Sequence, residues 1–169
     1  VIANGAECEP YLTIDERTMI ERPENVVEGV AITMKIVNAP EGIIAVEENK
    51  MHAIPLLEKA IASSPRTRAG MKIRVQLLKT KYPQGGERQL IRSVLGKIVP
   101  TGQIPPTIGV CVLNVATCAA IAEAVALNLP LTHRVTTVSG RAVARPGNYY
   151  VPIGMTVADL LEHCGGLTK

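Results

Sequence analysis

Two glutamates follow the first apolar run of the chain and make its first loop a candidate ligand site. The run Val1 to Ala3 ends at Asn4 and Gly5, and Glu7 and Glu9 come next. Glycine permits positive φ and lets a flat ligand approach the backbone closely. In an extended turn, two carboxylates spaced two residues apart project to the same side. Such a pair accepts hydrogen bonds from a carboxamide or from ribose hydroxyls, although a solvated acidic turn is the plainer interpretation of this loop alone.

A glycine pair forms the second candidate loop. Gly85 and Gly86 follow the alternating strand pattern of Met71 to Leu78 and precede the helical stretch Glu87 to Leu95. Adjacent glycines expose backbone N–H groups, and the start of a helix adds partial positive charge, which suits a phosphate or an electron-rich ring edge. The spacing matches neither a Walker loop nor the dinucleotide fingerprint. A tight turn is an equally good explanation of the glycines.

The third candidate loop contains Asn114 and Thr117. It joins the apolar strand Ile108 to Leu113 to an alanine-rich helix from Ala116 to Leu127. Asn114 is a suitable N-cap, and Thr117 stands where a capping box places a polar side chain, so capping alone would explain both residues. Three strands that end in such loops can share a crevice at one edge of a sheet.

The elements that carry these loops alternate along the chain. The predicted order is a strand over Val1 to Ala3, a helix from Pro23 to near Pro40, a strand over Gly42 to Glu47, a helix over Met51 to Ser63 and the strand Met71 to Leu78, with Pro65 to Gly70 as a polar turn. This order predicts a layered α/β domain. Residues 128–134 form a short linker, and residues 135–166 predict a compact β-grasp-like unit with two strands and a short helix.

Composition excludes several classes of protein. The 169 residues are 47% hydrophobic and include no Phe or Trp, so an aromatic platform that stacks nucleic-acid bases is absent and we expect no nucleic-acid partner. The net charge of +3 is mild and its basic residues are scattered. Four cysteines (Cys8, Cys111, Cys118 and Cys164) lack metal-motif spacing, and Cys111 and Cys118 are expected to be buried. Because the chain begins inside an apolar strand pattern, we interpret it as a fragment of a longer protein.

Taken together, the segments 4–10, 82–90 and 114–117 resemble the flavin- and NADH-binding module in the C subunit of the Rnf electron-transport complex, an ion-translocating oxidoreductase. This module is similar to the NADH-oxidising subunit of respiratory complex I. The resemblance covers nearly the whole chain and includes the blocks 47–50 and 80–87. It implies a Rossmann-like α/β domain over residues 1–130, truncated at its N-terminus, followed by a β-grasp domain of the soluble-ligand-binding (SLBB) type over residues 134–169.

The resemblance also implies site residues. FMN would be surrounded by Asn4, Tyr82, Gly85, Gly86, Glu87, Asn114 and Thr117, and NADH would be faced by Glu7 and Glu9. Ala6 and Gly86 stand where complex I carries carboxylates, in agreement with the Rnf pattern. A glycine-rich loop that closes over the FMN phosphate is expected before Val1, and the cysteine motifs of two 4Fe–4S clusters are expected after Lys169.

By this resemblance the chain is part of an NADH-dependent flavin oxidoreductase that passes electrons to iron–sulfur clusters. Its partners would be the other subunits of a membrane electron-transport complex and, indirectly, ferredoxin. Its location would be cytoplasmic and peripheral, on the inner membrane. The cofactors carry the chemistry, so no catalytic side chain and no metal ligand is assigned, and we expect the isolated fragment to be inactive. Two alternatives stay open: a cobalamin reductase of bacterial microcompartments, and a non-catalytic docking or ligand-binding module.

Overall fold

The computed structural model describes residues 1–168, and its main body is built on one parallel sheet. Four strands lie in the order β3-β2-β1-β4, each pair being parallel. Their bounds are β1 (Ile2–Gly5), β2 (Gly42–Glu47), β3 (Ile73–Leu78) and β4 (Val112–Asn114). This order places β1 inside the sheet and not at its edge. Parallel neighbours need crossover connections, which agrees with the predicted layered α/β domain.

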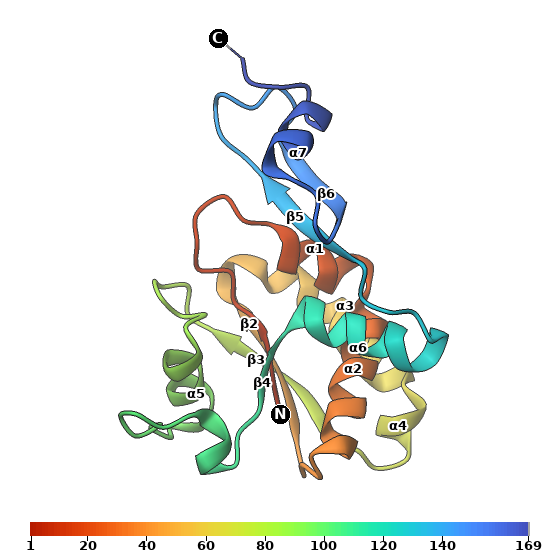
Figure 1. Ribbon diagram of the computed structural model, residues 1–169. Coiled ribbons are helices and arrows are strands. Elements are labelled where there is room, and N and C mark those ends of the chain that lie inside the picture. The colour runs from red at the N-terminus through yellow and green to blue at the C-terminus, as the bar shows by residue number, and fades with distance from the viewer. Residues whose placement is uncertain (169) are drawn as a thin grey trace.

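Helices cover both faces of this sheet (Figure 1). One face carries α2 (Pro23–Ile36), α3 (Ile54–Ser63) and α6 (Val115–Leu127), and the other carries α5 (Glu87–Leu95). Alternate residues of a strand point to opposite faces. Accordingly Ala3 and Ile44 belong to the core under α2 and α6, whereas Ile2 and Ala45 belong to the core under α5.

The two helices α2 and α6 pack at very short range because one of them presents a glycine. A Cβ atom at Gly29 would overlap the carbonyl oxygen of Cys118. The small side chains of the alanine-rich helix α6 permit the same close approach from the other side, and both Cys118 and Ala119 are buried. Packing at this density tolerates no added volume.

A second, smaller unit follows α6. It consists of the antiparallel pair β5 (His133–Val138) and β6 (Gly147–Pro152) and of the helix α7 (Val157–His163). It lies beyond α1 (Ile14–Glu21), at the end of the molecule opposite to α4 and α5 (Figure 1). A hydrogen bond of 2.9 Å from Asn148 Nδ2 to Thr13 Oγ1 links it to the start of α1.

The structure confirms the predicted α/β class, but several elements differ from those that the local sequence patterns predicted. Helix α1 was not predicted. The expected turn Pro65 to Gly70 contains a short helix, α4 (Pro65–Arg68), which Ser64 caps by accepting a hydrogen bond from Arg66 N. The expected helix Met51 to Ser63 is divided into the 3₁₀ segment η1 (Glu48–Ala53) and α3, and the strand expected from Ile108 is reduced to β4 after η2 (Pro105–Ile108).

Cys118 is buried as expected, whereas Cys111 is only half-buried. None of the helices within residues 1–168 is long and apolar enough to span a bilayer.

Candidate cofactor site

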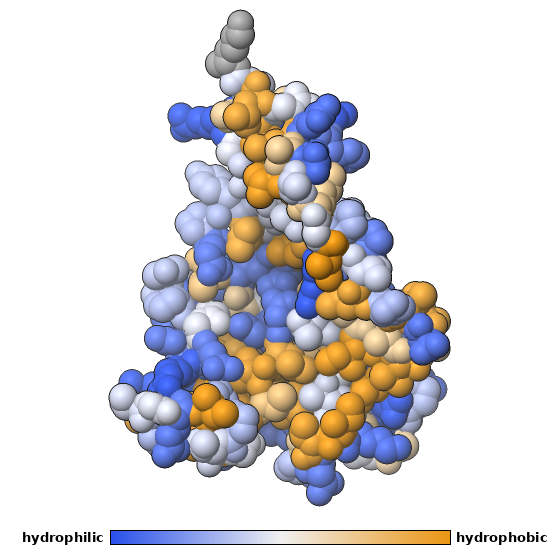
Figure 2. All heavy atoms as spheres, viewed as in Figure 1, coloured by the Kyte–Doolittle hydropathy of each residue, from blue (hydrophilic) through white to orange (hydrophobic). Residues whose placement is uncertain are grey.

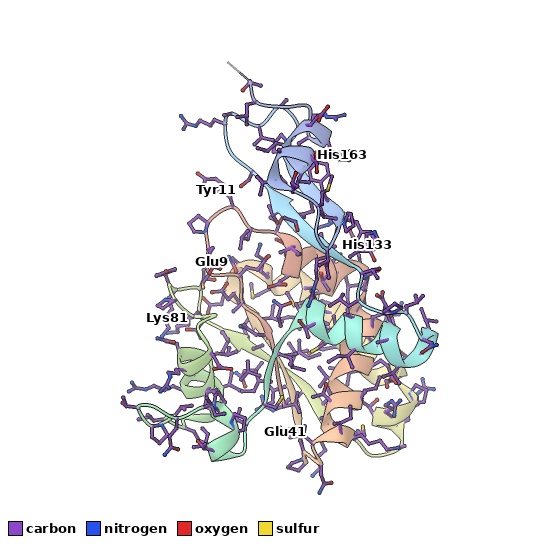
Figure 3. All side chains as sticks on the ribbon, in the orientation of Figure 1. Glu9, Tyr11, Glu41, Lys81, His133 and His163 are labelled. Atoms are coloured by element: carbon purple, nitrogen blue, oxygen red, sulfur yellow. The ribbon has the colours of Figure 1, made fainter. Side chains whose placement is uncertain are left out.

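The three predicted loops lie at one edge of the sheet. In a parallel sheet all strands end on the same side, and ligands of open α/β folds bind outside these carboxyl ends. Asn4 of β1 pairs in register with Asn114 of β4, so two of the predicted site residues lie on neighbouring strands. Figure 3 shows Glu9 and Lys81 on loops at this end and Glu41 at the opposite end. Hydrophilic side chains gather in the hollow between this edge and the C-terminal unit (Figure 2).

Asn4 joins the first two loops directly. Its Nδ2 donates a hydrogen bond of 2.9 Å to the carbonyl of Gly85, and its Oδ1 accepts one of 3.1 Å from the N–H of Ala6. A Cβ atom at Gly85 would overlap the carbonyl oxygen of Ala6. The glycine is therefore required by close contact between two backbones, and the expectation that these loops meet is confirmed.

The start of α5 offers unpaired backbone donors. Gly86 is the N-cap residue of this helix, and within residues 1–168 no side chain caps it. The first N–H groups of a helix have no partner within the helix, and they carry partial positive charge. Tyr82 and Glu87 flank this turn with exposed side chains. Gln84, between them, is buried, and its Oε1 has no hydrogen-bond partner in the described part of the chain.

Asn114 links the third loop to α1. Its Oδ1 accepts a hydrogen bond of 2.8 Å from Ala116 N, which makes it the predicted N-cap of α6. Its Nδ2 donates one of 2.7 Å to Asp15 Oδ2. Thr117 is not part of a capping box; instead its hydroxyl accepts a hydrogen bond of 3.3 Å from Arg134 of β5. Of the predicted residues, Thr117 is the one that contacts the C-terminal unit.

The two glutamates of the first loop do not face one space, contrary to the expectation from their spacing. Glu7 is only 8% exposed, and its carboxylate accepts hydrogen bonds of 2.8 Å and 3.2 Å from the N–H groups of Asp15 and Glu16. Glu7 thus caps α1, and the cap turns its side chain inward. Glu9 is exposed. The chain bends at Glu9 and turns at Pro10 and Tyr11, where Tyr11 has a positive φ of 67°.

A charged cluster surrounds this cap. Lys50 Nζ lies 3.8 Å from Glu7 Oε2 and also pairs with Glu16, whose other oxygen is 2.8 Å from His52 Nε2. Burial acts to raise the pKa of Glu16, but the hydrogen bond and charge of Lys50 outweigh it and lower this pKa below its usual value. The cluster fixes the loop after β2 against the start of α1.

Asp15 has the most perturbed carboxyl group of the site. Burial, and then the negative charge of Glu7, raises its pKa to about 7, although the hydrogen bond from Asn114 acts in the opposite direction. Asp15, Glu16 and His52 were missed from the sequence because α1 was missed. The signal was present: Thr13 and Glu16 have the Thr-x-x-Glu spacing of a capping box.

Comparison with models of known protein families shows which family the chain belongs to. A model of the Nuo51 FMN-binding domain matches residues 1–123. The chain belongs to this FMN-binding domain family. A model of the SLBB domain matches residues 135–169, in agreement with the predicted β-grasp unit.

Several curated relatives match nearly the whole chain. The C subunit of the proton-translocating ferredoxin:NAD(+) oxidoreductase complex of Clostridium ljungdahlii is 47% identical over 99% of this chain and 35% of its own length. The C subunit of the Na(+)-translocating complex of Acetobacterium woodii is 44% identical over 100% of this chain and 37% of its own length. The chain thus spans about a third of the length of each of these two relatives. The resemblance to the Rnf C subunit is confirmed, and the relatives favour it over the microcompartment reductase.

Solved structures agree with the family. An NAD+-reducing [NiFe]-hydrogenase in its air-oxidized state contains a chain that superposes with a TM-score of 0.83 at 27% identity, over 96% of this chain and 32% of that chain. The H2-reduced state of an NAD+-reducing [NiFe]-hydrogenase gives a TM-score of 0.80 at 25% identity, over 95% of this chain and 32% of that chain. The superposition covers nearly all of this chain, so it supports the arrangement of both the sheet and the C-terminal unit.

Proposed function

We propose that this chain is the FMN- and NADH-binding part of the C subunit of an ion-translocating ferredoxin:NAD(+) oxidoreductase complex. In this proposal NADH and FMN meet at the carboxyl edge of the sheet, and electrons continue to 4Fe–4S clusters in another part of the same protein. The domain division follows the expectation of an α/β domain over residues 1–130 and an SLBB domain over residues 134–169. The partners are the other subunits of the complex and, indirectly, ferredoxin, at the cytoplasmic face of the inner membrane.

One observation carries this proposal: in a chain of the FMN-binding family, two loops are bonded directly at one sheet edge, and the third lies beside them and is tied to α1. Asn4 binds Gly85 across the first two loops, and Asn114 stands beside Asn4 on the third. Binding sites of α/β sheets are found at this edge.

The donors present at the edge fit FMN. The uncapped start of α5 supplies N–H groups and partial positive charge, which suit an anion or the electron-rich edge of a ring. Gly85 lets the second loop lie against the backbone of Ala6, which brings the start of α5 next to the first loop. FMN would supply the redox chemistry, and the protein contributes binding and orientation. Asn4, Asn114 and Glu7 support the site indirectly, because their polar atoms form the hydrogen bonds that hold the loops in place.

Toward NADH, the geometry favours Glu9 over Glu7. The carboxylate of Glu7 is occupied by the cap of α1, whereas Glu9 is exposed at the same loop. Glu9 is therefore free to accept hydrogen bonds from the ribose or the carboxamide of the nicotinamide nucleotide. The gain is orientation of the two reactants, which can lower a barrier by several kcal/mol or more. In this proposal Glu7 supports NADH binding by keeping the loop in place.

Titration of FMN into the purified protein, followed by quenching of flavin fluorescence, tests the proposal. We expect saturable quenching in the wild-type chain. The variants Glu87→Ala and Asn114→Ala should bind FMN about ten-fold more weakly. Glu87→Ala removes a side chain expected to contact FMN, and Asn114→Ala breaks the hydrogen bonds that hold the third loop, each of which contributes about 1 kcal/mol or more.

The matched control is Glu58→Ala, which removes an exposed glutamate from the middle of α3. It should bind FMN as the wild type does. Absence of quenching in the wild-type protein would contradict the proposal. Quenching that survives unchanged in both site variants would place the flavin elsewhere on the molecule.

A further inference from the structure

The first turn of α1 contacts the first and third loops of the predicted site and the segment after β2. Its N–H groups at Asp15 and Glu16 bind the carboxylate of Glu7 in the first loop. Its Glu16 side chain pairs with Lys50, which follows β2. Its Asp15 side chain accepts the hydrogen bond of Asn114 at the end of β4. None of these α1 residues was assigned a role by the motifs.

Asp15 differs from Glu16 in the same turn because its carboxyl group is buried and, within residues 1–168, pairs with no cation. It is 8% exposed, and its side-chain partner is the neutral amide of Asn114. The charged groups that act on it are Glu7 and Glu9 from the loop before α1 and Arg134 from β5. Its neighbour Glu16 is paired with Lys50 and His52. Lys50 lies 3.8 Å from Glu7 Oε2, but neither it nor Arg134 forms an ion pair with Asp15 within residues 1–168.

We propose that Asp15 is a positioning residue of the flavin site, which orients Asn114 and places an exchangeable proton directly behind it. The inference rests on the proposed function, because there Asn114 holds the third loop of the flavin site. When the carboxyl group of Asp15 is protonated, Asp15 adds no charge next to Asn114. When it ionises, a negative charge lies one hydrogen bond away from Asn114 and acts against an anionic ligand. FMN affinity is thereby coupled to the protonation of Asp15.

The test compares the Kd for FMN from pH 5.5 to 8.5 in the wild type and in Asp15→Asn. Asparagine keeps the shape and an oxygen that accepts the bond from Asn114, but it does not ionise. We expect the wild type to lose about five-fold in affinity relative to Asp15→Asn as the pH rises through 7, since the charge of the carboxylate opposes the FMN phosphate. Titration of the phosphate itself is common to both proteins and cancels in the ratio.

Two further variants make the test selective. Asp159→Asn removes the other aspartate of the chain, an exposed residue of α7, and should follow the wild-type profile. Glu9→Gln should move the inflection of the profile to lower pH, because the charge of Glu9 raises the pKa of Asp15. Since Glu9 is exposed, this variant tests the inference even if Asp15→Asn does not fold.

The outcomes separate the inference from the proposal beneath it. A wild-type protein that binds no FMN at any pH overturns both. A wild-type protein that binds FMN with the same pH profile as Asp15→Asn overturns the role of Asp15 and leaves the flavin site in place. An inflection that stays fixed in Glu9→Gln also counts against Asp15 as the titrating group.

Discussion

The α/β part of the chain and its C-terminal unit differ in how they are held together. Residues 1–127 enclose two clusters of buried apolar side chains, one on each face of the sheet. Among the described residues 133–168, only Cys164 is buried. Burial of apolar surface is the main source of folding free energy, at roughly 25 cal/mol per Å². The α/β part therefore has its own core, whereas the small unit gains order from contacts with its neighbours.

Helix α1 is the element at which the two regions meet. Thr13, before its first turn, binds Asn148 of the small unit, and the next residues hold the loops of the predicted site. Arg134 of β5 also reaches Thr117 at the start of α6. The C-terminal unit is thus attached where the cofactor loops are fixed, and substitutions in each region can measure how far the two depend on each other.

The largest effect is expected from Gly29→Ala in the α/β part. The added Cβ would overlap the Cys118 carbonyl, so α2 and α6 must move apart and the core beneath them must repack. Overpacking of this kind costs about 3 kcal/mol or more of unfolding free energy. Denaturant unfolding followed by circular dichroism measures it.

Gly147→Ala is the matched change in the small unit. A Cβ there would meet only the ring of Tyr149, at 3.7 Å, so we expect a change within about 0.5 kcal/mol. Equal effects of the two substitutions would contradict the contrast between a self-contained core and a loosely packed unit.

Much of this fold could be predicted because local patterns and tertiary structure agree. The strand over Gly42 to Glu47 and the helix Glu87 to Leu95 occur with the predicted bounds. Helix α1 was missed because five of its eight residues are polar and its amphipathic pattern is weak. It is stabilised by the burial of Met19 in the core, by packing against α2, α3 and α6, and by the cap that Glu7 provides. Short polar helices of this kind depend on partners that are distant in sequence.

The location of the site could be predicted from the sequence, but the contacts of its side chains could not. The loops at strand ends follow from the order of the elements, and Asn4 and Gly85 do meet. The direction of Glu7 could not be deduced, because the alternation of side chains holds only while the backbone stays extended. Asp15 and His52 enter the site through α1 and η1, which are elements that the pattern of apolar residues did not define.

The second prediction concerns the stability of the α/β part as the pH changes. The pKa of Asp15 is raised from 3.8 to about 7 in the folded chain, so between these values the folded state binds more protons than the unfolded state. The free energy of unfolding must then fall as the pH rises through this window, and the loss is complete above pH 7. Asp15→Asn abolishes the effect. Relative to the wild type, the variant should gain on the order of 2 kcal/mol between pH 4.5 and pH 8.

The measurement is urea unfolding of both proteins at the two pH values. The asparagine amide brings a new N–H group that must be paired, but this cost is the same at both pH values and cancels in the difference between them. Asp159→Asn, in the exposed first turn of α7, should change stability by less than about 0.5 kcal/mol at either pH. A constant difference between wild type and Asp15→Asn would mean that the buried carboxyl group does not titrate in this range.

The smallest effect is expected at the link between the two regions. Asn148→Ala removes the hydrogen bond to Thr13 and also the 2.7 Å bond that Thr137 Oγ1 donates to Asn148 Oδ1. Because both bonds are exposed, we expect a cost of about 1 kcal/mol, seen as faster amide exchange in β5 and β6 and faster proteolysis of the linker 128–132.

A double-mutant cycle with Thr13→Val separates the link from the internal bond. The Thr13 hydroxyl makes no capping bond to α1 within the described residues, so its loss acts on the small unit alone. If the two regions are joined here, the double variant should show a coupling of about 0.5 kcal/mol with Asn148→Ala. Strictly additive effects would mean that α1 positions only the cofactor loops, and that the C-terminal unit is held to the α/β part through Arg134 and Thr117 instead.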